Sequence, residues 1–245
     1  MNLHLPKNTI LLTSVSFSFL IAYIYLFNKF TDIKEDIANR KNDAIGAKNS
    51  HVTLVLSLLF LMLPIPFIIK TNVLLLILYI FIALLGFFYS HKMILFNTPF
   101  RLKNIIFLKN ISAAVMWSLP LAMVPSILRG NIVLYDFISL SLLFLIAFSI
   151  EIFWDIRDME GDKKHHVNTI PNTYGILAAK IISAAQLALA SAIFAYFSYP
   201  FHYLATAVSL MVLILLTKKS WNFLYFHAAL FVWIIAMLAD ILIKT

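Results

Sequence analysis

Long apolar stretches separated by short polar connections run through the whole chain. Eight of them can be read, at residues 9–27, 51–70, 72–90, 105–127, 131–153, 176–197, 200–217 and 221–243. About 20 apolar residues are enough for a helix to cross about 30 Å of hydrocarbon, and helices satisfy their own backbone polar groups in lipid. The pattern predicts an all-α membrane protein, a bundle of about eight transmembrane helices that forms a single domain over residues 1–245.

The composition agrees with a protein whose main solvent is lipid. Hydrophobic residues make up 62% of the sequence and charged residues 12%, whereas soluble domains carry about 25% charged residues. The chain contains no cysteine, which excludes disulfides and thiolate metal sites. Basic loops explain the net charge of +8 better than nucleic-acid binding does, so we expect membrane lipids and no nucleic acid among the partners.

Most of the positive charge falls on one side of the predicted membrane. Of the 19 Lys and Arg residues, 15 lie in or beside the connections that follow the first, third, fifth and seventh apolar segments. Because basic loops remain in the cytoplasm, we expect this side to be cytoplasmic. The frequent use of Phe, Ile and Lys favours a low-GC bacterium and hence its inner membrane.

Nine of the 11 carboxylates lie on this same side, in two clusters. The first cluster, residues 28–40, reads NKFTDIKEDIANR and places four side chains at intervals of four: Asn28, Asp32, Asp36 and Arg40. If the first helix continues beyond residue 27, they form a stripe on one helical face. A single charged loop is ordinarily a solvated segment beside the membrane, so the functional interpretation depends on the second cluster.

The second cluster, residues 151–162, reads EIFWDIRDMEGD and places Asp155, Asp158 and Asp162 on one helical face. Glu151, one turn earlier, is a further candidate ligand. Stacked carboxylates at the end of a membrane helix repel one another unless a cation neutralises them. Mg²⁺ prefers oxygen ligands and binds through carboxylates together with phosphates. Two facing stripes therefore predict magnesium ions that hold a diphosphate, with simple ion pairs to nearby Lys and Arg as the alternative.

These residues resemble the motifs of the UbiA-type intramembrane prenyltransferase superfamily. The stretch DIRDMEGDKKHHVNTIPNTYG, from Asp155 to Gly175, looks like that family's second aspartate motif with its downstream Thr-Leu-Pro and Gly. The first cluster resembles the first motif through Asn28, Asp32, Asp36, Asn39 and Arg40. Tyr89-Ser90, followed by Pro99, Phe100, Arg101, Leu102 and Lys103, is similar to the family's Tyr-Ser and basic loop between the two motifs.

The resemblance implies Mg²⁺-dependent transfer of a prenyl group from an allylic prenyl diphosphate to a lipophilic acceptor, either an aromatic ring or a hydroxyl group. The metal ligands it implies are Asn28, Asp32, Asp36, Asp155, Asp158 and Asp162. Of these, Asp32, Asp36, Asp158 and Asp162 would be catalytic. The substrate-binding residues it implies are Arg40, Arg101, Lys103 and Lys163, with Tyr89 as a hydrogen-bond donor.

Three departures from the family pattern motivate an alternative. Lys29 stands where the first motif has Asp, His166 stands where the second has Gly, and one helix rather than two precedes the first motif, so the family's first of nine helices is absent from this pattern. The alternative is a non-catalytic homologue that binds isoprenoids or another membrane protein. A transporter or channel would place carboxylates near the membrane midplane, and here they lie at helix ends. The acceptor, the prenyl length and the oligomeric state stay open.

Overall fold

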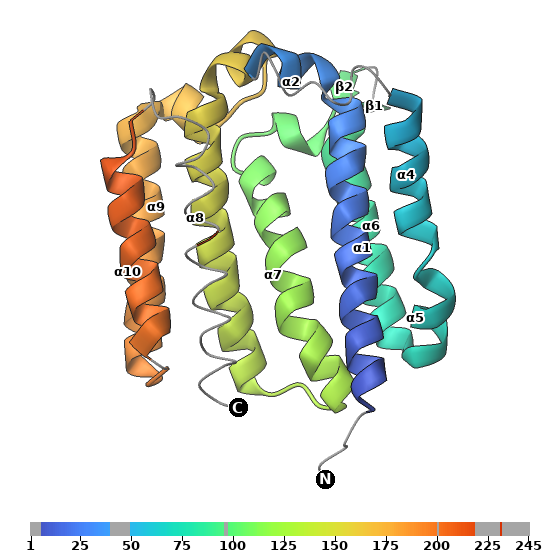
Figure 1. Ribbon diagram of the computed structural model, residues 1–245. Helices are drawn as coiled ribbons and strands as arrows, with labels where there is room; N and C mark the ends of the chain where they lie inside the picture. The colour runs from blue at the N-terminus through green and yellow to red at the C-terminus, as the bar shows by residue number, and fades with distance from the viewer. Residues whose placement is uncertain (1–5, 40–49, 96–97, 200, 219–230, 232–245) are drawn as a thin grey trace.

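The computed structural model describes residues 6–39, 50–95, 98–199, 201–218 and 231, which form a bundle of roughly aligned helices (Figure 1). Within this part of the chain, six helical segments are long and apolar enough to cross a membrane. They are α1 (Lys7–Thr31), α4 and α5 together (Ser50–Met62 and Ile65–Thr71), α6 (Val73–Ser90), α7 (Leu108–Arg129), α8 (Leu134–Lys164) and α9 (Ile170–Tyr196). The shorter α10 (Phe201–Leu216) follows. The predicted all-α membrane bundle is confirmed, and the predicted segment 221–243 lies outside the described residues apart from Phe231.

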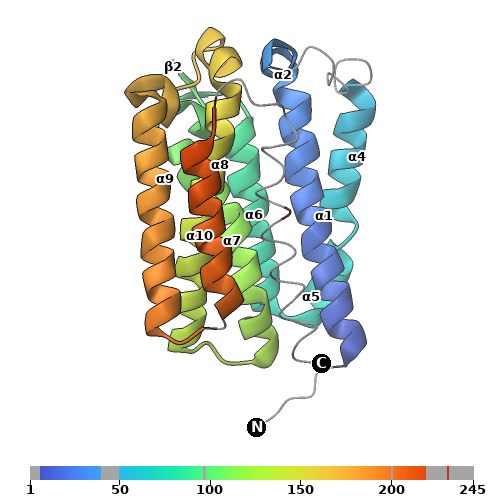
Figure 2. The ribbon, with the colours of Figure 1, turned by 60° about the vertical axis from the view of Figure 1, so that its left-hand side comes forward.

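Helices that follow one another in the sequence mostly pack side by side. The main contacts join α1 to α4 and α6, α6 to α7, α7 to α8, α8 to α9, and α9 to α10 (Figure 2). One apolar core lies around α1, α6 and α7 and includes the fully buried Leu20 and Ile82. Another joins α8, α9 and α10 through Phe153 and Leu187. Many large apolar side chains remain exposed on the outside, as expected for a surface that lipid covers.

Proline and glycine explain the irregularities in these helices. Pro64 separates α4 from α5, because proline has no backbone N–H to continue the hydrogen-bond ladder. Gly175 interrupts α9 with φ of +87°, a left-handed conformation that glycine adopts without steric cost. The predicted segments at 51–70 and 176–197 are thus each helical, but the first contains a break and the second extends back to Ile170.

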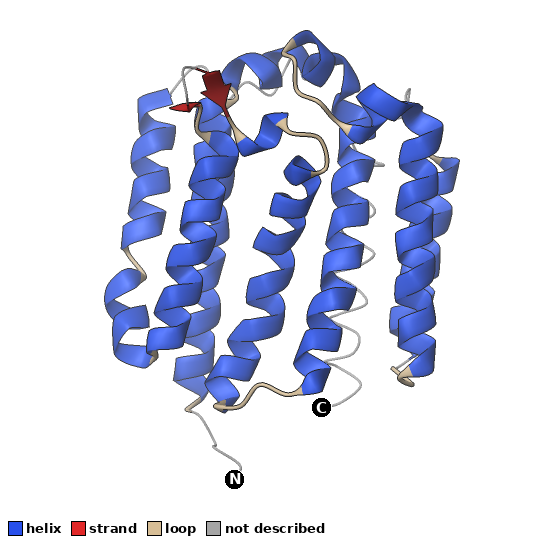
Figure 3. Cartoon of the chain, turned by 180° about the vertical axis from the view of Figure 1, so that it is seen from behind, coloured by secondary structure: helices blue, strands red, loops and turns tan. Residues whose placement is uncertain are grey.

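Short elements close one end of the bundle. After Asp32, the helix α2 (Ile33–Asn39) turns across this end and packs against α8 (Figure 1). The connection after α6 forms a hairpin of β1 (Met93–Leu95) and β2 (Thr98–Phe100), followed by the 3₁₀ turn η1 (Leu102–Asn104) (Figure 3). The hairpin has no counterpart in the sequence pattern. These elements bring both acidic clusters and the basic loop to one end, which we call the charged end.

Candidate functional site at the charged end

Asp32 lies at the junction of α1 and α2, with its carboxylate buried between two cations. Its backbone N–H donates to the Asn28 carbonyl at 2.9 Å, and the Asp36 N–H donates to the Asp32 carbonyl at 2.8 Å, so helical hydrogen bonding continues across the junction. Arg101 and Lys103 both donate to its carboxylate, which is 1% exposed. Burial alone would raise the pKa of Asp32, but Lys103 and Arg101 hold it below its ordinary value, so the group is a carboxylate at neutral pH.

The other described polar residues of the first cluster are less deeply buried than Asp32. The Asn28 Oδ1 accepts a hydrogen bond from the Ser90 hydroxyl of α6 at 3.1 Å. Lys29 Nζ lies 2.6 Å from Asp36 Oδ2, with both side chains partly exposed. Arg40 lies outside the described residues. The departure at Lys29 therefore has a structural consequence, because the lysine neutralises a predicted metal ligand.

The second cluster lies on α8, which stays helical through Lys164, eleven residues beyond the predicted end of its apolar segment. Asp155 and Asp162 both point to α7. Lys109 Nζ lies 2.6 Å from Asp155 Oδ1 and 2.9 Å from Asp162 Oδ2. The Asn110 Nδ2 donates to Asp155 Oδ2 at 2.7 Å. All four side chains are buried, so one ammonium and one amide stabilise this pair of carboxylates away from water.

Asp158 and Lys163 have different surroundings. The carboxylate of Asp158 accepts two hydrogen bonds from the neighbouring Arg157, at 2.8 and 2.6 Å, and the Arg157 guanidinium lies 5.8 Å from the centre of the Trp154 ring. Lys163 is exposed. The structure thus brings Asp155 and Asp162 together on one cation, while Asp158 is bound by its own helix.

Basic residues contact both clusters. Lys103 binds Asp32 directly, and Lys109 binds Asp155 and Asp162. Tyr89 is buried in the last turn of α6. Because α2 also packs against α8, carboxylates that are far apart in the sequence lie at the same end of the bundle.

Lys109 and Asn110 are the residues of this site that the sequence did not identify. Lys109 entered the sequence argument only as one of the basic residues that set orientation. A signal was present: a Lys-Asn pair begins an apolar helix on the same side as both acidic clusters. Charged and amide groups are rarely buried without partners, so a search for such pairs at helix starts would have found them.

The donor set is suited to Mg²⁺. Carboxylate and amide oxygens are the ligands that hard cations prefer, and the charged end supplies both kinds. In the part of the chain that the structure describes, no three acidic or histidine side chains converge as a ready metal cage, since ammonium and guanidinium groups stand between the carboxylates. The buried Asn110 Oδ1 has no hydrogen-bond partner among the described residues. The charged end therefore combines carboxylates that already bind cationic side chains with the Asn110 amide oxygen, which no described group uses.

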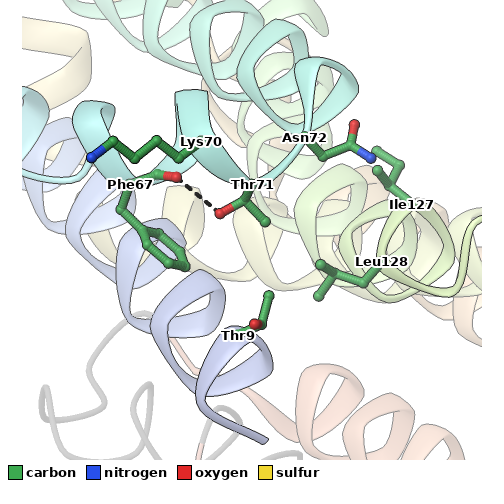
Figure 4. A pocket seen from close by; sticks show the side chains of 7 residues that line it. All are labelled: Thr9, Phe67, Lys70, Thr71, Asn72, Ile127 and Leu128. Carbon is green, nitrogen blue, oxygen red and sulfur yellow. Dashed lines mark hydrogen bonds between the residues drawn. The ribbon is translucent and has the colours of Figure 1, made fainter. Parts of the chain in front are cut away.

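Two cavities lie away from the charged end. One of about 370 Å³ lies between α1 and α7 and is lined by apolar residues such as Phe17, Ile21, Trp117 and Leu121. The other, of about 450 Å³, lies where the far ends of α1, α5 and α7 meet (Figure 4). Its described lining includes Lys70 but no carboxylate. The described lining of the second cavity therefore lacks the carboxylates of a magnesium site.

The profile of the UbiA prenyltransferase family matches residues 2–241, and the chain belongs to this family. A UbiA homologue from Aeropyrum pernix K1, solved in its apo form, has a similar fold, with a TM-score of 0.69 and 14% identity over 97% of this chain and 91% of that one. A structure described as digeranylgeranylglyceryl phosphate synthase gives a TM-score of 0.53 and 19% identity over 95% and 83%. Curated protein sequences give no significant match.

Proposed function

We propose that this protein transfers a prenyl group from an allylic prenyl diphosphate to a lipophilic acceptor, with the diphosphate bound at the charged end in the presence of Mg²⁺. The observation that carries the proposal is that one end of the bundle holds both aspartate clusters together with basic side chains, with Lys103 bound to Asp32 and Lys109 bound to Asp155 and Asp162. Membership of the UbiA prenyltransferase family supports it. A site of alternating carboxylates and cations, buried at the end of a membrane bundle, suits an ionic head group attached to an apolar chain.

The roles of the side chains follow from the charge that develops. Cleavage of the allylic carbon–oxygen bond leaves negative charge on the diphosphate, and groups already oriented toward that charge lower the barrier. Arg101 and Lys103 would bind its oxygens by charge-assisted hydrogen bonds. The residues that would hold metal ions are Asn28, Asp32, Asp36, Asp155, Asp158 and Asp162. Bound Mg²⁺ would supply Lewis-acid stabilisation of the leaving group.

The apolar cavity between α1 and α7 is the proposed place for the prenyl chain. Its lining on α1 runs from Ser14 to Ile21, 11 to 18 residues before Asp32. At 1.5 Å per residue, this lining begins about 16 Å and ends about 27 Å from the carboxylate. A long isoprenoid whose head group lies at Asp32 would therefore reach it. Lipid and apolar side chains would keep water from the allylic cation, whether the acceptor is an aromatic ring or a hydroxyl group.

A second candidate function is favoured by the Lys29–Asp36 ion pair of 2.6 Å. This ion pair occupies the carboxylate of Asp36, one of the proposed metal ligands. Such an arrangement is expected for a homologue that binds an isoprenoid diphosphate without turning it over. Binding without turnover would support this candidate.

The test measures both steps on purified protein in detergent. Binding of a non-hydrolysable geranylgeranyl diphosphate analogue, and release of diphosphate from geranylgeranyl diphosphate with a screen of aromatic and hydroxyl acceptors, are compared with and without Mg²⁺. We expect Asp32→Asn and Asp162→Asn to lose binding. Asp136→Asn is the matched control, because Asp136 is another buried aspartate of α8 that pairs with Arg129 at the opposite end. Metal-independent binding, or equal loss in the control, would contradict the proposal.

A further inference from the structure

Lys109 occupies the position between two carboxylates where a metal ion would be expected. Its Nζ bridges Asp155 Oδ1 and Asp162 Oδ2 at 2.6 and 2.9 Å, although the two aspartates are seven residues apart on α8. Without this ammonium, two buried like charges would repel each other across the helix face. A single cation from a neighbouring helix thus bridges two carboxylates of the second cluster and offsets part of their charge.

Both carboxylate oxygens of Asp155 already have a partner. Lys109 binds Oδ1 and the Asn110 Nδ2 binds Oδ2 at 2.7 Å. A divalent cation that binds either oxygen comes close to the Lys109 ammonium, and the repulsion between the two positive charges favours displacement of the lysine. Its charge lies at the end of a flexible stem, whereas the neutral Asn110 amide is not repelled.

We propose that Lys109 is an internal counter-ion that competes with the divalent cation for Asp155 and Asp162. This inference rests on the proposed function, since it concerns the metal of that site. On entry of a metal with its diphosphate, the displaced ammonium would turn to the phosphate oxygens and offset part of their negative charge. Metal and diphosphate then bind with positive coupling. The metal releases the ammonium to bind the diphosphate, and the diphosphate attracts the ammonium away from the two aspartates. Lys109 acts through the two aspartates and is a positioning residue in the free protein.

The sign of the effect on metal affinity separates this role from an ordinary structural one. Removing a structural residue weakens metal binding, whereas removing a competing cation tightens it. We expect Lys109→Met to bind Mn²⁺ at least about tenfold more tightly than the unmodified protein when no diphosphate is present, since a neighbouring charge commonly changes the ionic preference of a carboxylate by that factor or more. The gain in Mn²⁺ affinity that inorganic pyrophosphate brings should shrink by a similar factor.

The experiment titrates Mn²⁺ into the full chain in detergent and detects the free ion by electron paramagnetic resonance, with and without pyrophosphate. Lys109→Arg keeps the charge and should remain within about threefold of the unmodified protein. Arg129→Met removes a cation from the Asp136 pair at the opposite end and should leave Mn²⁺ affinity unchanged. If Lys109→Met does not survive purification, Lys109→Gln is compared instead, with the Mn²⁺-induced rise in melting temperature as the second readout.

The outcomes distinguish this inference from the function on which it rests. The internal counter-ion is supported if Lys109→Met binds Mn²⁺ more tightly and the Lys109→Arg and Arg129→Met controls do not. This holds even if the unmodified protein binds Mn²⁺ only with pyrophosphate. Equal or weaker binding by Lys109→Met, while the unmodified protein binds, overturns the inference and leaves the proposed function intact. If neither protein binds Mn²⁺ under any condition, the metal site is absent and both fall.

Discussion

Asn110 is a neutral side chain that binds directly to an aspartate of the second cluster, Asp155. Its amide donates to Asp155 Oδ2 at 2.7 Å and is fully buried, and its Oδ1 has no hydrogen-bond partner among the described residues. A charge-bearing acceptor that loses its buried donor cannot turn to water, and such a loss costs about 1–3 kcal/mol or more. The stability of the charged end therefore depends on an uncharged residue as well as on ion pairs.

We expect Asn110→Ala to lower the free energy of unfolding by about 1–3 kcal/mol, measured by thermal or denaturant unfolding in detergent without metal. Asn131→Ala is the control, because Asn131 also binds a charged side chain, Arg129, but at an exposed position. Its effect should stay within about 0.5 kcal/mol. Equal effects of the two substitutions would show that burial of Asp155 does not depend on the amide.

At the scale of elements, the contact between α1 and α6 positions the first cluster. Gly86 lies against Ile24, and a Cβ built on Gly86 would come within 2.6 Å of the Ile24 Cγ1. One turn closer to the charged end, Ser90 donates to Asn28. Small residues allow such close approach of membrane helices. The spacing of Gly86 and Ser90, four residues apart on one face, thus sets the distance between α6 and the start of the first motif.

We expect Gly86→Leu to push α6 away from α1 and to separate Ser90 from Asn28. Helix content should persist, since the overpacking of one contact costs about 1–3 kcal/mol, but binding of the prenyl diphosphate analogue should fall more than tenfold. Far-ultraviolet circular dichroism and the binding assay measure the two quantities. Ala83→Leu, one turn earlier on the same helix and only partly buried, is the comparison. Undiminished binding by Gly86→Leu would show that this contact does not position the site.

The elements themselves could largely be predicted from the sequence, because apolar length is a direct consequence of membrane thickness. Seven of the eight predicted segments are helical in the described residues. The apolar pattern ends at Phe153, whereas α8 continues to Lys164, as the helical spacing of Asp155, Asp158 and Asp162 indicated. Its last turns are held by contacts with α7 and α2, and such tertiary support does not appear in hydrophobic periodicity.

The candidate site could be predicted in its acidic half but not in its basic half. The aspartates recur at helical intervals, which a single segment displays, and the structure places them at one end. The identity of each counter-ion depends on which helices meet. Lys109 precedes Asp155 by 46 residues and Arg101 follows Asp32 by 69, so no local pattern joins them. Only packing of α7 on α8, and of the η1 turn on α6 and α7, determines those pairs.

For the molecule as a whole, charge is concentrated at one end, and this asymmetry predicts how the protein lies in the membrane. The charged end carries both aspartate clusters and most of the Lys and Arg, while the opposite end has the Arg129–Asp136 pair and Lys70. Basic loops are retained in the cytoplasm. The charged end, and with it the proposed diphosphate site, should therefore face the cytoplasm.

The absence of cysteine from the sequence makes this orientation directly measurable. Single cysteines replace Lys34 or Lys164 at the charged end and Asn131 at the opposite end, all exposed positions. In intact expressing cells, we expect a membrane-impermeant maleimide to label Asn131→Cys and to spare the other two, and all three to react after permeabilisation. Labelling of Lys34→Cys and Lys164→Cys in intact cells would reverse the orientation, and the proposed substrate would then have to arrive from outside the cytoplasm.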